Sequence, residues 1–281
     1  MQLKAEDYLE PSCPLCGKPG QIQPAQPIPV PRVMERLQLY EDRGDWAAAG
    51  RHLRYWLAEA EQNGDRRGQL TLQNELMGFC RKQGEREQAL AHAEAAVRLV
   101  DALDMRETVT AGTTWVNAGT VLEAFGDPAA GLRYFEWARA NYERNLSLED
   151  PRLGGLYNNM ALALSALHQY RQAEEMFRLA LSVMGRQPNG QLEQAVTWLN
   201  LADLAEAEAG PEAAEPTVQE YLSRATDLLN APGLPRDGAY AFVCEKCAPV
   251  FGHYGYFLEE AELRRRAAEI RGSTSERMDA S

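Results

Sequence analysis

Apolar residues recur along this chain at helical spacing, in paired segments separated by short polar turns. The clearest pair covers residues 113–140 and turns at Gly126, Asp127 and Pro128. Because its apolar positions form one stripe on each segment, the pattern predicts two amphipathic helices packed as a hairpin. The stripe consists of Trp115, Ala118, Gly119 and Leu122 on the first helix, and Gly131, Phe135 and Ala138 on the second.

The same pattern returns in the next segment of the chain. Trp115 and Tyr157 are 42 residues apart, as are Phe135 and Phe177. Gln73 lies 42 residues before Trp115, and Trp198 lies 41 residues after Tyr157. Self-similarity at a fixed period indicates a solenoid, in which each hairpin buries its apolar face against its neighbours. The matching positions of the second copy are Tyr157, Met160, Ala161, Leu164, Ala173, Phe177 and Ala180.

Three regions follow from this periodicity. Residues 30–271 form the solenoid of about six helical hairpins, the last of them degenerate and covering residues 239–271. Residues 1–29 form an extended arm with a CxxC motif, because four prolines within residues 21–31 favour polyproline II over a packed element. Residues 272–281 are polar and are expected to be a disordered tail. The hairpin turns are expected at Gly44-Asp45, Gly84, Gly126, His168-Gln169 and Gly210-Pro211.

These repeats resemble the tetratricopeptide repeat (TPR), and their spacing is closer to the kinesin-light-chain variety than to the standard 34 residues. The resemblance implies an all-α fold, a right-handed TPR superhelix, that binds a protein or peptide as a scaffold or adaptor. Residues 240–257 are also similar to the closing segment of uncharacterised bacterial TPR proteins, which implies no activity.

The resemblance also implies a concave groove lined by the first helix of each hairpin. Asn117, Asn159 and Asn200 share one repeat position, and in related peptide-binding repeats asparagine at that place holds the ligand backbone. Asparagine carries both a donor and an acceptor, so a ladder of them suits the amides of an extended peptide. The alternative is that these asparagines bond to neighbouring helices and bridge the repeats. The candidate peptide-binding residues are Asn74, Arg81, Lys82, Asn117, Thr120, Asn158, Asn159, Asn200 and Asp203.

Two CxxC pairs suggest a zinc site of four thiolates, formed by Cys13, Cys16, Cys244 and Cys247. The arm from residue 17 to residue 31 reaches about 45 Å at ~3.1 Å per residue, which would bring the first pair to the last hairpin. The alternative is a flexible knuckle at the front and buried core thiols at the back. Cys80 falls at a core position.

Composition and charge restrict the classes of partner that this chain is expected to bind. The net charge of −12 disfavours nucleic acid as a partner. The basic run of residues 264–266 lies beside acidic residues, as on a solvated helix face. The sequence shows no signal peptide and no apolar run of about 18 residues, so no membrane partner is expected. Five cysteines then favour a reducing cytoplasm over a disulfide framework.

Three hypotheses remain at this point. The first is a protein-binding or peptide-binding scaffold or adaptor, and not an enzyme, because no phosphate loop, GxSxG or HExxH motif is present. The second is a peptide-sensing receptor that regulates through a partner protein. The third is a zinc-dependent structural protein, whose cysteine pairs control closure or dimerisation. The aromatic stretch of residues 240–257 fits either core packing or a ligand surface at the end of the array. The sequence does not indicate an oligomeric state.

Overall fold

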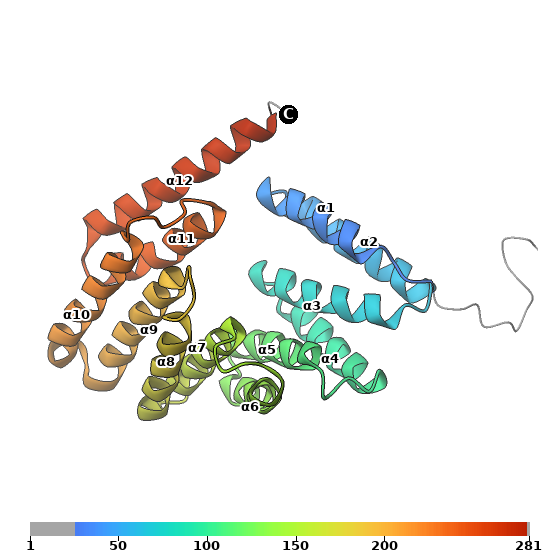
Figure 1. The fold of residues 1–281 in the computed structure, drawn as a ribbon, viewed down its shortest axis with the longest axis horizontal. Coiled ribbons are helices and arrows are strands. Elements are labelled where there is room, and N and C mark those ends of the chain that lie inside the picture. The colour runs from blue at the N-terminus through green and yellow to red at the C-terminus, as the bar shows by residue number, and fades with distance from the viewer. Residues whose placement is uncertain (1–25, 280–281) are drawn as a thin grey trace, which may run out of the picture.

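The computed structural model describes residues 26–279, and the regular structure in that range consists of twelve helices joined by short turns (Figure 1). Consecutive helices pair as six hairpins, so the repeat pattern of the sequence is confirmed. The helices are α1 (Val30–Asp42), α2 (Trp46–Gln62), α3 (Arg66–Lys82), α4 (Arg86–Ala102), α5 (Val109–Ala124), α6 (Pro128–Asn145), α7 (Pro151–Ala166), α8 (Tyr170–Met184), α9 (Gln191–Ala209), α10 (Pro211–Leu229), α11 (Gly238–His253) and α12 (Phe257–Asp279).

The turns follow a common scheme. Gly44 and Gly126 adopt positive φ angles of 66° and 89°, a conformation that glycine reaches without steric cost. An aspartate follows each of them. The side chains of Asp45 and Asp127 each accept a hydrogen bond from the backbone N–H three residues later, which caps the next helix. His168 takes the same left-handed conformation at φ 58°. The turns at these positions therefore agree with the sequence prediction.

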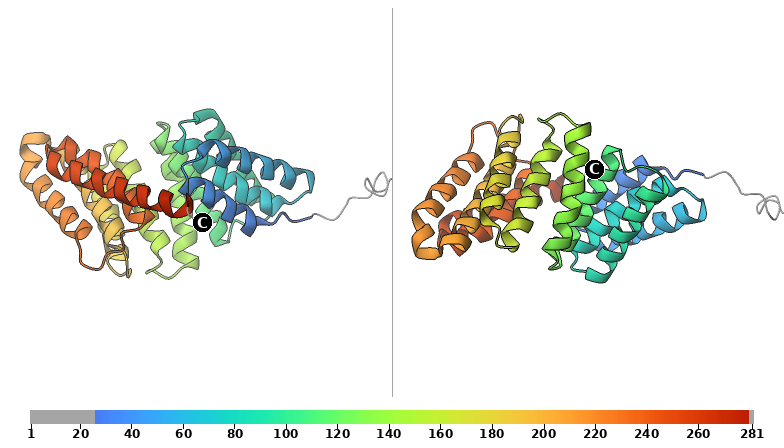
Figure 2. Two further views of the ribbon diagram at one scale, coloured as in Figure 1. Left: turned by 90° about the horizontal axis from the view of Figure 1, so that it is seen from above. Right: turned by 90° about the horizontal axis from the view of Figure 1, so that it is seen from below.

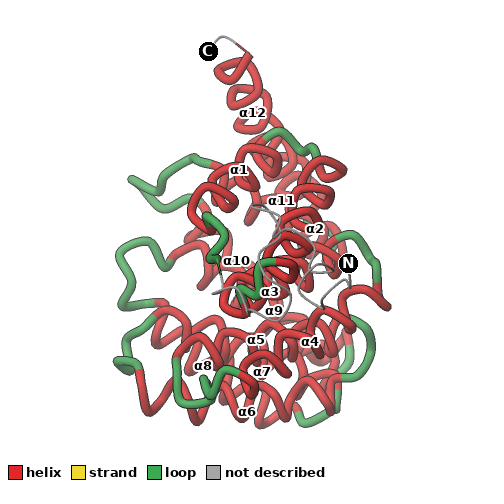
Figure 3. The backbone as a smooth tube through the Cα atoms, turned by 90° about the vertical axis from the view of Figure 1, so that its right-hand side faces the viewer, coloured by secondary structure: helices red, strands yellow, loops and turns green. Residues whose placement is uncertain are grey.

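The hairpins stack side by side into a curved array (Figure 1). The first helices of the hairpins, α3, α5, α7, α9 and α11, line its inner side, and α4, α6, α8 and α10 form its outer side. Views from above and below show the array winding as a superhelix (Figure 2). From the side that carries α1 to α4, the array is seen as helices linked by short loops (Figure 3).

The core lies between the inner and outer helix layers. Phe135 of α6 is fully buried at 0% exposure, and it packs where Gly119 of α5 leaves room. A Cβ atom added at Gly131 would lie 2.8 Å from the carbonyl oxygen of Gly119, so the α5 and α6 backbones cross in close contact here. Large and small residues thus alternate across the helix pair as the sequence pattern predicts.

The buried residues form two large clusters. One contains residues of α1 to α8 and the other residues of α9 to α12. A small third cluster between them consists of Ala161, Leu164, Ala173, Phe177, Leu201 and Leu204. The two halves of the solenoid therefore have separate cores, which are joined at α7 to α9.

The structure shows two features at the ends of the predicted solenoid that the sequence did not indicate. Ile28, assigned to the arm, is only 7% exposed, and its backbone N–H donates to Asp65 Oδ2 at 2.9 Å. A single large apolar side chain is enough to fix the end of the arm against α3. At the other end, α12 continues to Asp279 through the segment that was expected to be a disordered tail. No proline follows Gly272, so no residue of that kind interrupts the helix there.

Candidate functional site

The inner face of the solenoid carries a cavity of about 480 Å³. Its walls are formed by α1, α2, α3, α5, α7 and α11, which means that it spans the first and the last hairpin. Cavities of this size are typical of ligand sites. Six of the nine predicted peptide-binding residues line it, namely Asn74, Arg81, Lys82, Asn117, Thr120 and Asn159.

The other three predicted residues lie outside this lining. Asn158 and Asn200 bond to each other, since the Asn200 amide donates to Asn158 Oδ1 at 3.0 Å. Asp203 accepts from the Tyr254 hydroxyl at 2.9 Å. These residues follow the same inner face toward α11, but the structure does not place them with the first six.

The asparagines link consecutive hairpins. The Asn117 amide of α5 donates to Asn74 Oδ1 of α3 at 3.1 Å, and the Asn159 amide of α7 donates to Thr120 Oγ1 of α5 at 3.3 Å. With the bond between Asn200 and Asn158, three successive pairs of inner helices are joined in this way. The bridging hypothesis is thus confirmed for this position. Bridging uses one donor on each asparagine and fixes its side-chain orientation.

Part of the hydrogen-bonding capacity of these amides stays available. Asn74 makes three hydrogen bonds, because its amide also donates to Leu70 O at 2.9 Å and Thr114 Oγ1 at 3.1 Å. Asn117 Oδ1 and Asn159 Oδ1, by contrast, accept no hydrogen bond from any residue in the described range. Both side chains line the cavity and are half-buried. They can therefore offer carbonyl oxygens, held in place by the bridges, to a molecule in the cavity.

Charged side chains surround these amides. Arg81 forms no ion pair with any described residue, whereas Lys82 lies 3.9 Å from Glu41. Burial raises the pKa of Glu75, and the neighbouring Glu41 carboxylate raises it further, while Lys82 opposes both. Burial also raises the pKa of Glu123, against the opposing effect of Arg81. The cavity therefore combines a free guanidinium with carboxyl groups that are partly desolvated.

Sequence reasoning missed four of the charged groups in this cavity, namely Glu41, Glu75, Glu123 and Lys246. Glu41 lies at the end of α1, outside the inner positions assigned from the repeats. Lys246 comes from α11 and lines the same cavity as Leu37 of α1. A repeat register assigns faces within a hairpin but does not show that the first and last hairpins meet. No local signal could have identified Lys246.

Near the C-terminal end, a polar cluster joins α9 to α11. The Tyr254 hydroxyl lies 2.9 Å from Asp203 Oδ1 and 3.2 Å from Glu206 Oε2, and His253 Nε2 lies 3.1 Å from the same Glu206 oxygen. Desolvation raises the pKa of Asp203, although the bond from Tyr254 opposes that change. This cluster continues the series of polar links between inner helices, so Asp203 has a bridging role.

The second cysteine pair lies in the protein core. Cys244 and Cys247 are 0% and 1% exposed, and burial raises the pKa of both thiols, that of Cys247 to about 12. Cys13 and Cys16 lie outside the described residues. Within residues 26–279, no group of His, Cys, Asp and Glu side chains is arranged to hold a metal ion. A site with all four thiolates would require the α11 pair to leave this core, so zinc stays a prediction that metal content by mass spectrometry tests.

Burial of the thiols gives a direct prediction. In a variant with Cys13→Ser and Cys16→Ser, the remaining thiols Cys80, Cys244 and Cys247 should not react with Ellman's reagent at pH 8 in the native protein. Burial raises the pKa of Cys80 to about 11. A rise of that size leaves about 100-fold less of the reactive thiolate. All three should react after unfolding in guanidinium chloride. Rapid reaction of a native thiol would show that the core around it opens.

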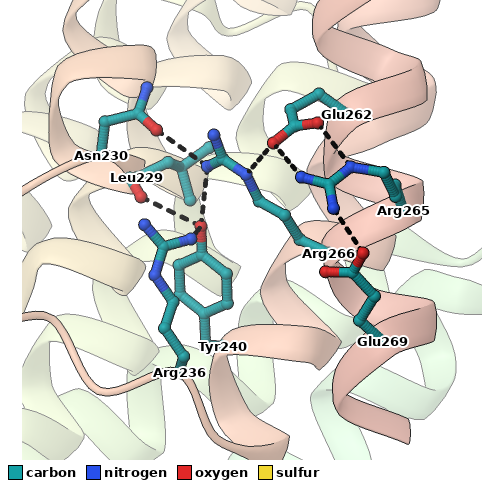
Figure 4. Close-up of polar contacts among 8 residues, drawn as sticks. All are labelled: Leu229, Asn230, Arg236, Tyr240, Glu262, Arg265, Arg266 and Glu269. Carbon is teal, nitrogen blue, oxygen red and sulfur yellow. Dashed lines mark hydrogen bonds and ion pairs between the residues drawn. The ribbon is translucent and has the colours of Figure 1, made fainter. Parts of the chain in front are cut away.

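The aromatic stretch of the last hairpin is divided between core and surface. Tyr240 and Phe251 are 0% and 1% exposed, whereas Phe242 and Phe257 are exposed. The Tyr240 hydroxyl accepts from Arg266 at 2.9 Å and from Arg236, and it donates to Leu229 O at 3.1 Å (Figure 4). This network ties α12 to the end of α10. Core packing is confirmed for Tyr240 and Phe251.

The basic run of α12 is mostly a solvated face, as predicted. Arg264 pairs with Glu260 at 2.7 Å, and Arg265 pairs with Glu262 at 2.8 Å. Arg266 is the exception, because it turns inward to Tyr240 and donates to Asn230 Oδ1 at 2.8 Å (Figure 4). Its role is structural.

Comparison with solved structures agrees with this architecture. A Rap protein complexed with competence and sporulation factor matches with a TM-score of 0.56 and 15% sequence identity, over 87% of this chain and 64% of that one. The fold is that of a tetratricopeptide-repeat solenoid. A Podosopora anserina structure with nearly identical TPR-like repeats of the kinesin light chain type matches with a TM-score of 0.50 and 17% identity. That match covers 73% of this chain and 96% of the other.

These similarities concern the TPR fold alone, because sequence identity is low. This chain spans less than two thirds of the Rap protein that it matches. No family of known sequences matches the chain, and no curated protein matches it by sequence. Within residues 26–279, no helix combines the length and the apolar character that a membrane crossing needs.

Proposed function

We propose that this TPR protein binds an extended peptide segment of a partner protein in its inner cavity, as a scaffold or adaptor. The observation that carries the proposal is the pair of unused carbonyl oxygens of Asn117 and Asn159, held at one repeat position on adjacent inner helices. An extended peptide presents backbone N–H groups along its length, and these are the donors that such oxygens accept. The proposed activity is binding and not catalysis.

The charges of the cavity suit a peptide ligand. Arg81 offers a guanidinium that forms no ion pair within 4 Å in the described range, although Glu123 of the same cavity lies near enough to interact with it electrostatically. Guanidinium groups bind carboxylates in a bidentate manner. Apolar side chains of Leu37, Phe79 and Val116 also line the cavity and can receive apolar side chains of the ligand. Most of the lining residues are polar or charged, so hydrogen bonds and ion pairs would contribute most of the specificity for a peptide.

Replacing either Asn117 or Asn159 by alanine should weaken peptide binding by about 3-fold to 10-fold, the effect of one hydrogen bond. The probe is the best binder from a phage-displayed library of random linear peptides, resynthesised with a fluorophore. Dissociation constants would be measured by fluorescence anisotropy.

The chain provides a matched control for this experiment. Asn200 occupies the same repeat position and makes the same kind of bridge, but it lies outside the cavity lining. Asn200→Ala should thus lose a similar amount of thermal stability and keep its affinity for the peptide. Equal affinities for all three variants, or a library that yields no binder, would contradict the proposal.

A receptor for one short peptide is a second candidate, and its support is the Rap structure solved with competence and sporulation factor. The same library separates the two candidates. A receptor should select one tightly bound sequence, whereas a scaffold should select a family of related sequences of moderate affinity.

A further inference from the structure

The inner cavity has a wall that comes from the opposite end of the chain. Lys246 of α11 lines it together with Leu37 and Glu41 of α1. In the ribbon, the far end of α12, which belongs to the same hairpin as α11, approaches α1 across the mouth of the curved array (Figures 1 and 2). The site is consequently bounded by the first and last hairpins, which are far apart in the sequence.

The two edges that face each other both carry charged side chains, with carboxylates exceeding cations at the end of α1 and the reverse at the edge of the last hairpin. The end of α1 presents Glu41 and Asp42, and the last hairpin presents Lys246 and Arg271. Arg271 pairs with Glu245 of its own hairpin at 3.1 Å. Asp42 also acts on it electrostatically across the gap, since both carboxylates raise the pKa of Arg271. Lys246 forms no ion pair within 4 Å in the described range, so its charge is available to the opposite edge or to a ligand.

The two edges also belong to different cores. Val33 and Leu37 of α1 lie in the cluster of α1 to α8, whereas Cys247 and Leu263 lie in the cluster of α9 to α12. The small cluster at α7 to α9 lies between the two, and partly buried apolar residues such as Met176 and Trp198 pack against it from either side. In a repeat array, each hairpin contacts mainly its neighbours, so small rotations between hairpins add up to a large displacement at the ends. A small rotation between hairpins at α7 to α9 would therefore change the distance across the mouth.

We propose that the last hairpin completes the inner site, with Lys246 as its closing wall, and that charge attraction between this hairpin and α1 sets whether the site is open or closed. The identity of the enclosed ligand, a peptide, rests on the proposed function. The opening and closing of the site does not, because it would take place in the unliganded chain as well. A peptide would enter through the open form and would be held by the closed one. Lys246 would then provide a further cation, in addition to Arg81 and Lys82, for a carboxylate of the ligand.

Small-angle X-ray scattering of the full, unliganded chain tests the closure. The radius of gyration should increase between 50 mM and 1 M NaCl, because the screening length falls from above 10 Å at low salt to about 3 Å at 1 M. The double variant Lys246→Glu, Arg271→Glu should show the larger radius already at low salt. Adding Glu41→Lys and Asp42→Lys to it should restore the smaller radius, since attraction across the mouth returns with its sign exchanged.

A control with the same change of net charge is Arg171→Glu, Arg178→Glu on α8, whose side chains pair with Glu175 and Glu174 of the same helix. It should keep the radius of the natural chain. If the radius of gyration of the natural chain does not depend on salt, the proposal is overturned. It is also overturned if the four-residue variant is folded, as judged by circular dichroism, but keeps the larger radius.

Failure of this experiment is distinguishable from failure of the proposed function, because no peptide is present. With a peptide from the library, Lys246→Ala should bind several-fold more weakly through faster dissociation, whereas its association rate should change little. An unchanged dissociation rate would count against Lys246 as the closing wall.

Discussion

Replacement of Phe135 by alanine is expected to lower the free energy of unfolding by about 3–5 kcal/mol. The ring of Phe135 is fully buried between α5 and α6, and it fills the space beside Gly119. Helix backbones that already touch at Gly119 and Gly131 cannot move closer to close the gap. The cavity left by the ring therefore stays open, and the loss should fall in the upper part of the range for aromatic truncation.

The measurement is urea unfolding followed by circular dichroism, with the midpoint and slope compared to those of the natural chain. Glu136→Ala is the control, because Glu136 is the adjacent residue of α6 and is exposed. Surface substitutions of this kind change stability by about 0.5 kcal/mol or less. A native-like midpoint for Phe135→Ala would show that the repeat register assigned to α6 is wrong.

Replacement of Gly131 by alanine should destabilise the protein by about 1–3 kcal/mol, even though alanine is the better helix former. The added Cβ atom would lie 2.8 Å from the carbonyl oxygen of Gly119. That oxygen belongs to the backbone of α5, so contact is relieved only if the two helices separate. Separation would in turn loosen the packing around Phe135.

Gly155 of α7 gives a control with the opposite sign. A Cβ atom at this position meets no atom within 4 Å, and the residue lies inside a helix. Gly155→Ala should raise stability by about 0.5–1 kcal/mol, because alanine loses less conformational freedom on folding. Thermal unfolding gives the midpoints of Gly131→Ala and Gly155→Ala, which are compared with the midpoint of the natural chain. If both substitutions shift the midpoint in the same direction, the close crossing of α5 and α6 does not limit the packing.

The inner face shows how far a repeat register predicts a site. The shared position of Asn117, Asn159 and Asn200 predicts that all three side chains lie on one face, and the structure confirms it. Which groups each amide contacts was not predictable, because Asn117 reaches Asn74 whereas Asn159 reaches Thr120. The two bonds span 43 and 39 residues, a difference of slightly more than one helical turn. The position of α5 that corresponds to Asn74 is Val116, which has no side-chain acceptor.

For the cysteines, the sequence motif did not predict the environment of the side chains. Cys244 and Cys247 have the spacing of a metal-binding pair, yet in α11 both thiols lie in the core. Residues at i and i+3 on a helix share one face, so the same spacing serves a buried stripe equally well. The sequence motif alone cannot separate these two cases, because the difference is whether another helix covers that face.

What the sequence determined by itself is the repeating unit. The 42-residue spacing, the alternation of large and small residues, and the turns at Gly44, Gly84 and Gly126 specify six hairpins and their inner faces. These signals are local, because each hairpin packs against its immediate neighbours. The tertiary structure alone decided that Lys246 and Glu41 line one cavity. The reason is that curvature is the accumulated sum of small rotations between hairpins, and no single repeat encodes that sum.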